Sequence, residues 1–155
     1  ALEAQQLLKK DYGVVADVWS VTSWGELRRD GLAHDKAKFN DPFGEHAPTW
    51  VESKLAGTQG PIVAVSDYMH AVPDLIRPWV PREYTTLGAD GFGFSDTRAA
   101  ARRYYNIDGP SIAVAVLQQL AYKGEIPREW PVEAAERYRL DDVSAGTSGK
   151  TGDDE

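Results

Sequence analysis

Three short stretches of the chain combine apolar and β-branched residues in the manner of strands. Residues 14–21 (VVADVWSV) and 61–66 (PIVAVS) are nearly continuous in apolar side chains. Strands that helices cover on both faces have this pattern, which favours a parallel sheet. Residues 83–88 (EYTTLG) are less apolar but have good strand propensity. The pattern therefore predicts three strands.

Helical periodicity separates these strands. Leu2, Leu7 and Leu8 lie on one stripe of a helix over residues 1–12, which Gly13 would end. The clearest helix is the one over residues 110–123, whose cap is Asp108 or Ser111 and whose apolar stripe is broad. Further helices are predicted over residues 23–29, 49–56, 73–80, 97–106 and 132–139. The predicted class is α/β, with helices flanking a mostly parallel sheet in three layers.

The two ends of the chain differ from its middle. The first helix opens at Ala1 without Ser, Thr, Asp or Asn before it, which favours reading the chain as the inside of a longer protein. Residues 144–155 (SAGTSGKTGDDE) have no apolar periodicity, and from residue 141 the acids outnumber the one lysine. The expected organisation is one domain over residues 1–140 and an acidic flexible tail over residues 141–155.

Composition and charge narrow the function classes. The chain has 155 residues, a formal net charge of -7 and no cysteine. The missing cysteine excludes disulfides, thiolate metal sites and cysteine nucleophiles. The acidic balance argues against a nucleic-acid partner, and no apolar run is long enough to predict a membrane span. The cytoplasm is the default location.

Ligands of doubly wound sheets bind outside the carboxyl ends of the strands, so the candidate chemistry lies there. Asp67 or Asp90 could act as a general acid or base with His70 nearby, and the backbone of residues 91–93 could approach a ligand. Structural roles compete with this interpretation. Ser66, Asp67, Ser95 and Asp96 each precede a helical stretch that they can cap, and Asp90-Gly91 is a common turn pair.

Other apparent motifs carry less chemistry. Residues 91–96 lack the third glycine of a dinucleotide fingerprint, and residues 149–151 lack the earlier glycine of a phosphate loop. His34, His46 and His70 have no partner at helical spacing, so the sequence does not support a zinc site. A cluster of three arginines could bind an anion, but a solvated helix face is the preferred interpretation for Arg98, Arg102 and Arg103.

Four segments in order carry a resemblance to a known family. They are residues 17–31 (DVWSVTSWGELRRDG), 65–69 (VSDYM), 76–81 (IRPWVP) and, above all, 84–98 (YTTLGADGFGFSDTR). The chain resembles the C-terminal domain of the homodimeric, thiamine-diphosphate-dependent pyruvate dehydrogenase component over about residues 14–126. His70 departs from the family pattern, in which lysine is more common at this position.

The resemblance implies a transketolase-like C-terminal domain with a five-stranded, mostly parallel sheet, whose first strand and glycine-rich turn precede the helix that begins at Ala1. It implies that the whole enzyme decarboxylates pyruvate on thiamine diphosphate with Mg²⁺ and reductively acetylates a lipoyl group. Because the family's ligands and catalytic residues lie upstream, no catalytic, cofactor-binding or metal residue is assigned in this chain. The implied partners are the upstream catalytic domains, a homodimer mate and the dihydrolipoyl acetyltransferase of the complex.

Alternatives remain open at this point. The chain could be a free-standing, non-catalytic α/β module that binds a small ligand through Asp67, Tyr68, Asp90 and the glycine loop. It could also be the same domain of another 2-oxo acid dehydrogenase or of a transketolase. If the first strand is absent, the isolated chain leaves a sheet edge unpaired and is expected to aggregate.

Overall fold

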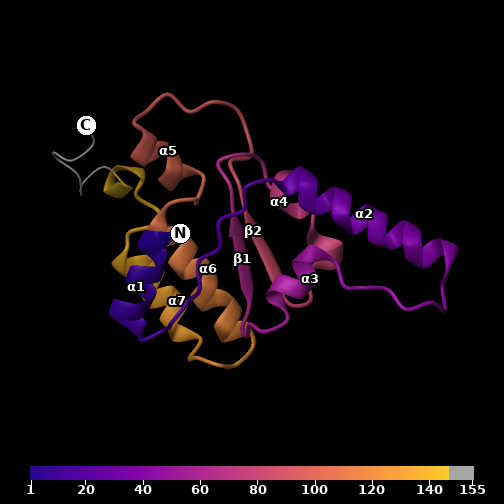
Figure 1. Cartoon of the computed structure of the whole chain (residues 1–155). Helices are drawn as coiled ribbons and strands as arrows, with labels where there is room; N and C mark the ends of the chain where they lie inside the picture. Colours follow the sequence, from indigo (N-terminus) through magenta and orange to yellow (C-terminus); the bar gives the residue numbers. More distant parts are fainter. Residues whose placement is uncertain (147–155) are drawn as a thin grey trace.

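A computed structural model describes residues 1–146 of the chain (Figure 1). Helices flank a small parallel sheet whose two strands are separated by helical segments, in agreement with the predicted α/β class. In chain order the elements are α1 (Leu2–Tyr12), α2 (Trp24–Asn40), α3 (Trp50–Leu55), β1 (Ile62–Val65), α4 (Ala71–Asp74), the 3-10 helix η1 (Arg77–Trp79), β2 (Tyr84–Leu87), α5 (Arg98–Tyr104), α6 (Gly109–Tyr122), α7 (Glu129–Arg137) and the 3-10 helix η2 (Val143–Gly146).

The sheet consists of β1 and β2, which pair in parallel with Ile62 opposite Tyr84 and Val65 opposite Leu87. These are two of the three predicted strands. In Figure 1, α1, α6 and α7 lie on one side of the two strands and α3 and α4 on the other, so the sheet forms the middle layer. This arrangement covers both faces of β1, as its apolar sequence IVAV predicts.

The third predicted strand, over residues 14–21, is wrong. This segment runs as extended chain between α1 and α2 without a strand assignment. Its apolar residues do pack, since Val14 and Ala16 lie against the larger core cluster. What the segment lacks is a neighbouring strand within residues 1–146 to exchange backbone hydrogen bonds with.

Two apolar clusters hold the layers together. The larger lies between α1, α6 and α7 and contains Ala4, Leu8, Ile112, Ala113, Val114, Leu117 and Ala134. The smaller lies beyond β2 and contains Val51, Ile76 and Trp79. Asp108 is the cap of α6, because its carboxylate accepts a hydrogen bond from the Ser111 amide at 3.0 Å.

Three predicted helices differ in extent. The helix predicted over residues 23–29 continues to Asn40, and the helix predicted over 132–139 begins at Glu129. The helix predicted over 73–80 is divided into α4 and η1. Pro78 lies inside η1 and has no amide to donate, which accounts for the break.

The predicted tail is partly folded. Val143–Gly146 form η2, which packs against α5, and Asp142 accepts a hydrogen bond from the Ser144 amide at 2.9 Å. The rest of the predicted acidic tail, residues 147–155, lies outside the described residues.

Gly31 is a point of close contact between α2 and the body of the domain. It is the one buried residue of α2, and a Cβ built there would lie 2.3 Å from the Trp79 ring. We therefore expect Gly31→Ala to push α2 away from Trp79 and to lower the free energy of unfolding by about 1–3 kcal/mol, the range for overpacking a core. Denaturant unfolding of the protein measures this. Gly25→Ala is the matched control, because only the Ser23 hydroxyl lies near that site, at 3.9 Å. Equal stability of both variants would contradict the packing assignment.

Candidate functional site

A groove of about 680 Å³ follows β1. The walls are the extended segment over residues 14–22 on one side and β1 on the other. Side chains of α6 contribute Ile112, Val116 and Leu120, and α1 closes one end with Ala1, Ala4 and Leu8. The groove thus has an apolar lining and two extended backbones along its length.

One edge of β1 faces this groove without a strand partner. Toward β2, the Ile62 amide donates to the Glu83 carbonyl at 2.9 Å and the Ser66 amide to the Leu87 carbonyl at 3.1 Å. Because successive backbone groups of a strand point to opposite edges, the amides of Val63 and Val65 point away from β2. Within residues 1–146 the sheet has no third strand on that side. The edge is therefore a template for one more strand.

The opposite wall of the groove is held in place by α1. The Gln5 side-chain amide donates to the Ala16 carbonyl at 2.6 Å, which fixes the extended segment near the start of α1. Several apolar side chains of this wall remain open to solvent. Val15 is 81% exposed and Trp19 is 54% exposed, unlike the interior of an α/β layer. Residues 14–21, which have the sequence pattern of a buried strand, are therefore only partly buried in this structure.

The residues predicted at the carboxyl ends of the strands do come together, in pairs. The His70 amide donates to Asp90 Oδ1 at 3.0 Å, and His70 Nδ1 contacts Asp90 Oδ2. Arg102 of α5 donates to Asp67 at 3.3 Å. Both pairs are largely exposed, and exposed ion pairs contribute little energy. Asp90 thus has a histidine partner in another loop, and Asp67 has an arginine partner on α5.

The glycines after β2 have two roles, one in close packing and one in a turn. A Cβ at Gly88 would lie 2.5 Å from the His70 backbone nitrogen, so this glycine lets the loops after β1 and β2 touch. Gly91 has φ of 126°, a conformation that favours glycine. The Tyr105 hydroxyl donates to the Phe92 carbonyl, and the Phe94 ring stacks on Tyr104 with centroids 4.5 Å apart.

The predicted capping roles are wrong, because α4 begins after His70 without a side-chain cap and α5 is capped by another residue. Ser66 and Asp96 make local turn contacts instead: the Ser66 hydroxyl accepts a hydrogen bond from the Tyr68 amide at 3.1 Å, and Asp96 accepts one from the Thr97 amide at 2.7 Å. Thr97, which the sequence interpretation did not name as a cap, is the N-cap of α5. Asp67 makes its contact with Arg102 instead.

The arginine cluster divides into two environments. Arg102 is exposed, as a solvated helix face predicts, but Arg103 is only 4% exposed. Its guanidinium donates to Asp108 at 2.6 Å and to the carbonyls of Tyr138 and Arg139 at 2.7 and 3.0 Å. The prediction of a solvated face is thus wrong for Arg103, because the C-terminal end of α7 folds back over α5.

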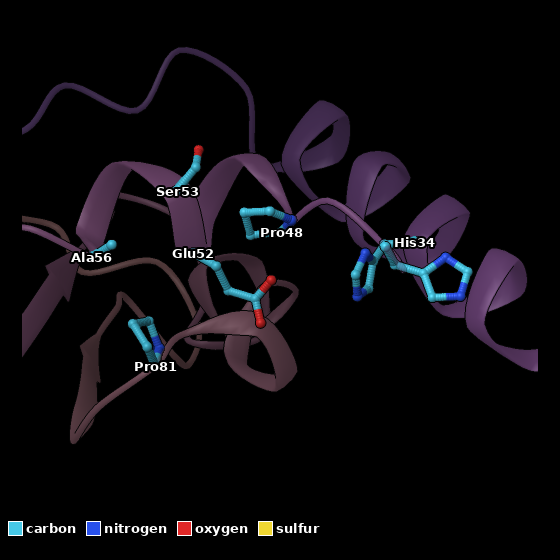
Figure 2. Close-up of a pocket in the computed structure, with 7 residues that line it drawn as sticks. His34, Pro48, Glu52, Ser53, Ala56 and Pro81 are labelled. Carbon is cyan, nitrogen blue, oxygen red and sulfur yellow. The ribbon is translucent and has the colours of Figure 1, made fainter. Parts of the chain in front are cut away.

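A second pocket, of about 440 Å³, lies where α2 approaches α3 (Figure 2). Its lining includes His34, His46 and Glu52, and the Glu52 carboxylate points from α3 toward the side where His34 lies. The His34 and His46 rings meet edge to face, with centroids 6.2 Å apart. Sequence reasoning missed this pair, because the loop over residues 41–49 that returns from α2 to α3 carries no signal of its path.

The Glu52 carboxylate is committed to the start of α3. It accepts hydrogen bonds from the amide and hydroxyl of Thr49 at 2.8 and 2.9 Å, and the Thr49 hydroxyl accepts from the Glu52 amide at 3.2 Å, which completes a capping box. The hydrogen bond from the Thr49 amide is the main cause that lowers the pKa of Glu52. Burial raises this pKa, and the nearby His34 and Lys38 lower it further. Among residues 1–146 no three histidine, aspartate or glutamate side chains converge to hold a metal ion.

Glu52→Gln is expected to weaken the start of α3 in a pH-dependent way. Since the folded state lowers the pKa of Glu52, its carboxylate stabilises the fold above the ordinary glutamate range, and this contribution is lost as the pH falls through the folded-state pKa. At pH 7 the variant should lose up to about 1 kcal/mol, typical of a capping interaction. Thermal unfolding between pH 7 and pH 3 should show the two proteins converging at the acid end. A constant difference across that range would contradict the role of the charge.

The class of protein follows from the fold and from comparison with known families. Residues 1–108 match the family described as the transketolase-like TK C-terminal domain. The chain belongs to this family, and the resemblance inferred from the four segments is confirmed.

The particular relatives are proteins named pyruvate dehydrogenase E1 component. That of Mycolicibacterium smegmatis is 59% identical over 145 residues, which cover 94% of this chain and 16% of the relative. That of Mycobacterium tuberculosis is 55% identical over 151 residues, covering 97% of this chain and 16% of the relative. That of Escherichia coli K12 is 36% identical over 140 residues, which cover 90% of this chain and 16% of the relative. The chain thus spans about one sixth of the length of these relatives.

No helix among residues 1–146 has both the length and the apolar character that crossing a membrane requires.

Proposed function

We propose that this chain is the C-terminal domain of a pyruvate dehydrogenase E1 component, an enzyme that decarboxylates pyruvate on thiamine diphosphate with Mg²⁺ and reductively acetylates the lipoyl group of an acyltransferase. The similarity to proteins named pyruvate dehydrogenase E1 component, at up to 59% identity over most of the chain, supports this proposal. The proposed setting is a homodimer in the cytoplasm that works with a dihydrolipoyl acetyltransferase.

Residues 1–146, which the structure describes, do not fit the cofactor of that reaction. Among residues 1–146 no cluster of acidic or histidine side chains is arranged for Mg²⁺. The glycine loop after β2 supports its own turn and the contact with His70. We therefore assign thiamine diphosphate and Mg²⁺ to the upstream domains and derive no catalytic step through residues of this chain.

The role proposed for this domain is structural, and the groove along β1 is the observation that carries it. An upstream strand that lies in the groove would accept hydrogen bonds from the outward amides of Val63 and Val65. Its other edge would meet the extended segment over residues 14–21, which is apolar and has no strand partner among the described residues. Adding one strand would thus join residues 14–21, β1 and β2 into a continuous sheet and would cover the half-buried Val116 of α6.

The test is deletion and reassembly in the longer enzyme. An E1 component that lacks this domain should lose its stable dimer and its thiamine-dependent decarboxylation of pyruvate. Co-expression of the upstream part, including its last strand, with this chain as a separate polypeptide should restore both. A deleted enzyme with full stability and full activity would contradict the structural role. A full-length protein that acts on a different 2-oxo acid or on a ketose, and not on pyruvate, would contradict the proposed substrate.

A further inference from the structure

The helix α2 and the loop after it form an arm, defined here as residues 24–46, that extends from the domain beyond α3 (Figure 1). Seventeen residues of α-helix have a length of about 25 Å. The contacts of this arm with the domain lie on one side. Gly31 rests against Trp79, the Trp79 indole donates to Asp35 at 3.1 Å, and the Trp50 amide donates to Asp30 at 2.7 Å. The arm is therefore anchored along its inner face.

The flank of the arm next to its anchored row, and the tip of the arm, carry uncovered apolar side chains. Leu32 is 45% exposed, Phe39 is 86% exposed, and Phe43, which follows the helix, is 98% exposed. Leu32 and Phe39 are seven residues apart, so they lie on one face of the helix. A single exposed apolar residue is ordinary, but three on one projecting element are typical of a surface that another body covers.

The uncovered surface continues into the groove along β1. The extended segment that forms one wall of the groove leads directly into α2, and it carries the half-exposed Trp19 and the partly exposed Val21. Trp24, the first residue of α2, also lines the groove. The apolar lining of the groove thus reaches the base of the arm at Trp24.

We propose that the arm lies on the upstream part of the same polypeptide, with Phe39 and Phe43 as its anchoring side chains. This inference rests on the proposed function, in which the domain belongs to a chain about six times longer. Two observations select this occupant. The relatives have 84% of their length outside the matched region, since the match covers 16% of them, and the groove reaches the first residue of the arm, Trp24. A large upstream body beside the groove would also meet the arm.

Photo-crosslinking in the full-length dimeric enzyme tests the proposal. The photoreactive residue p-benzoyl-phenylalanine replaces Phe39 in one variant and Tyr122 in the control. Tyr122 is 79% exposed and is the last residue of α6, and Figure 1 shows α6 and α2 on opposite sides of the two strands. Dimers mixed from isotopically light and heavy chains separate links within a chain from links between chains. The expected result is a link from position 39 to a peptide upstream of Ala1 in the same chain, at several-fold higher yield than from position 122.

A link only to the partner chain, a link only within this domain, or yields equal to the control would each overturn the proposal. A second pair of variants gives an independent readout. Phe39→Ser with Phe43→Ser should lower the melting temperature of the full-length enzyme more than Tyr122→Ser with Val132→Ser, a pair of exposed apolar residues on α6 and α7. Equal losses would count against the arm as an anchor. If no upstream link forms while the amides of Val63 and Val65 are protected from hydrogen exchange, the proposal for the arm is overturned and the proposal of an upstream strand in the groove is retained.

Discussion

In the full-length dimeric enzyme proposed above, Val65→Pro is expected to abolish the stable dimer and its activity. The Val65 amide points away from β2, so proline at this position spares the hydrogen bonds between β1 and β2. It removes the donor that an upstream strand would use and places a ring at the point of closest approach. The buried acceptor left unpaired costs about 1–3 kcal/mol, and exclusion of the strand from the groove adds to this loss. Size-exclusion chromatography and thermal unfolding measure the effect.

Two variants control for general damage to β1. Val65→Ile keeps the amide and the branched side chain, and it should retain a stable dimer. Ala64→Pro removes an amide that points toward β2, and it should destabilise the enzyme whether or not a strand fills the groove. If Val65→Pro behaved as Val65→Ile does, the outer edge of β1 would face solvent in the enzyme and the structural role assigned to the groove would be wrong.

Arg103→Leu is expected to destabilise the domain by about 3–5 kcal/mol, the range for removing one partner of a buried ion pair. Arg103 is the one charged residue among the buried residues of the described chain. Its loss would leave the Asp108 carboxylate and the carbonyls of Tyr138 and Arg139 without their donor. Since Asp108 also caps α6, the start of the main core helix would be affected. Denaturant unfolding of the full-length enzyme measures the loss.

Its neighbour Arg102 provides the matched control. Arg102→Leu removes an exposed contact of 3.3 Å with Asp67 and should cost less than about 1 kcal/mol. Arg103→Lys keeps the charge but cannot reach Asp108 and two carbonyls in a planar fork, so an intermediate loss is expected. Similar losses for Arg102→Leu and Arg103→Leu would contradict the buried network.

Local patterns were sufficient for much of the fold. The helix α6 follows directly from its apolar run and from the Asp108 cap, and both strands of the sheet were predicted from short apolar or β-branched runs. The pattern of residues 14–21 reports apolar surroundings correctly, since Val14 and Ala16 pack on the core. Strand formation also needs a partner backbone, and the composition of a segment does not contain its partner.

Longer-range features could not be predicted for a related reason. The burial of Arg103 depends on the path of the chain after α7, which places the Tyr138 and Arg139 carbonyls over α5. The contact between His34 and His46 depends on an irregular loop. The proximity of His70 and Asp90 was easier to predict, because both residues follow parallel strands and therefore lie at one edge of the sheet.

Hydrogen exchange at Val63 and Val65 tests the central claim most directly. Amide exchange would be compared between the full-length enzyme and the 155-residue chain, with residue-level resolution over β1. The account predicts strong protection of both amides in the full-length enzyme and fast exchange in the separate chain, while the Ala64 amide, which faces β2, is the less affected of the three. Fast exchange of Val63 and Val65 in the full-length enzyme would contradict the claim that an upstream strand completes this sheet.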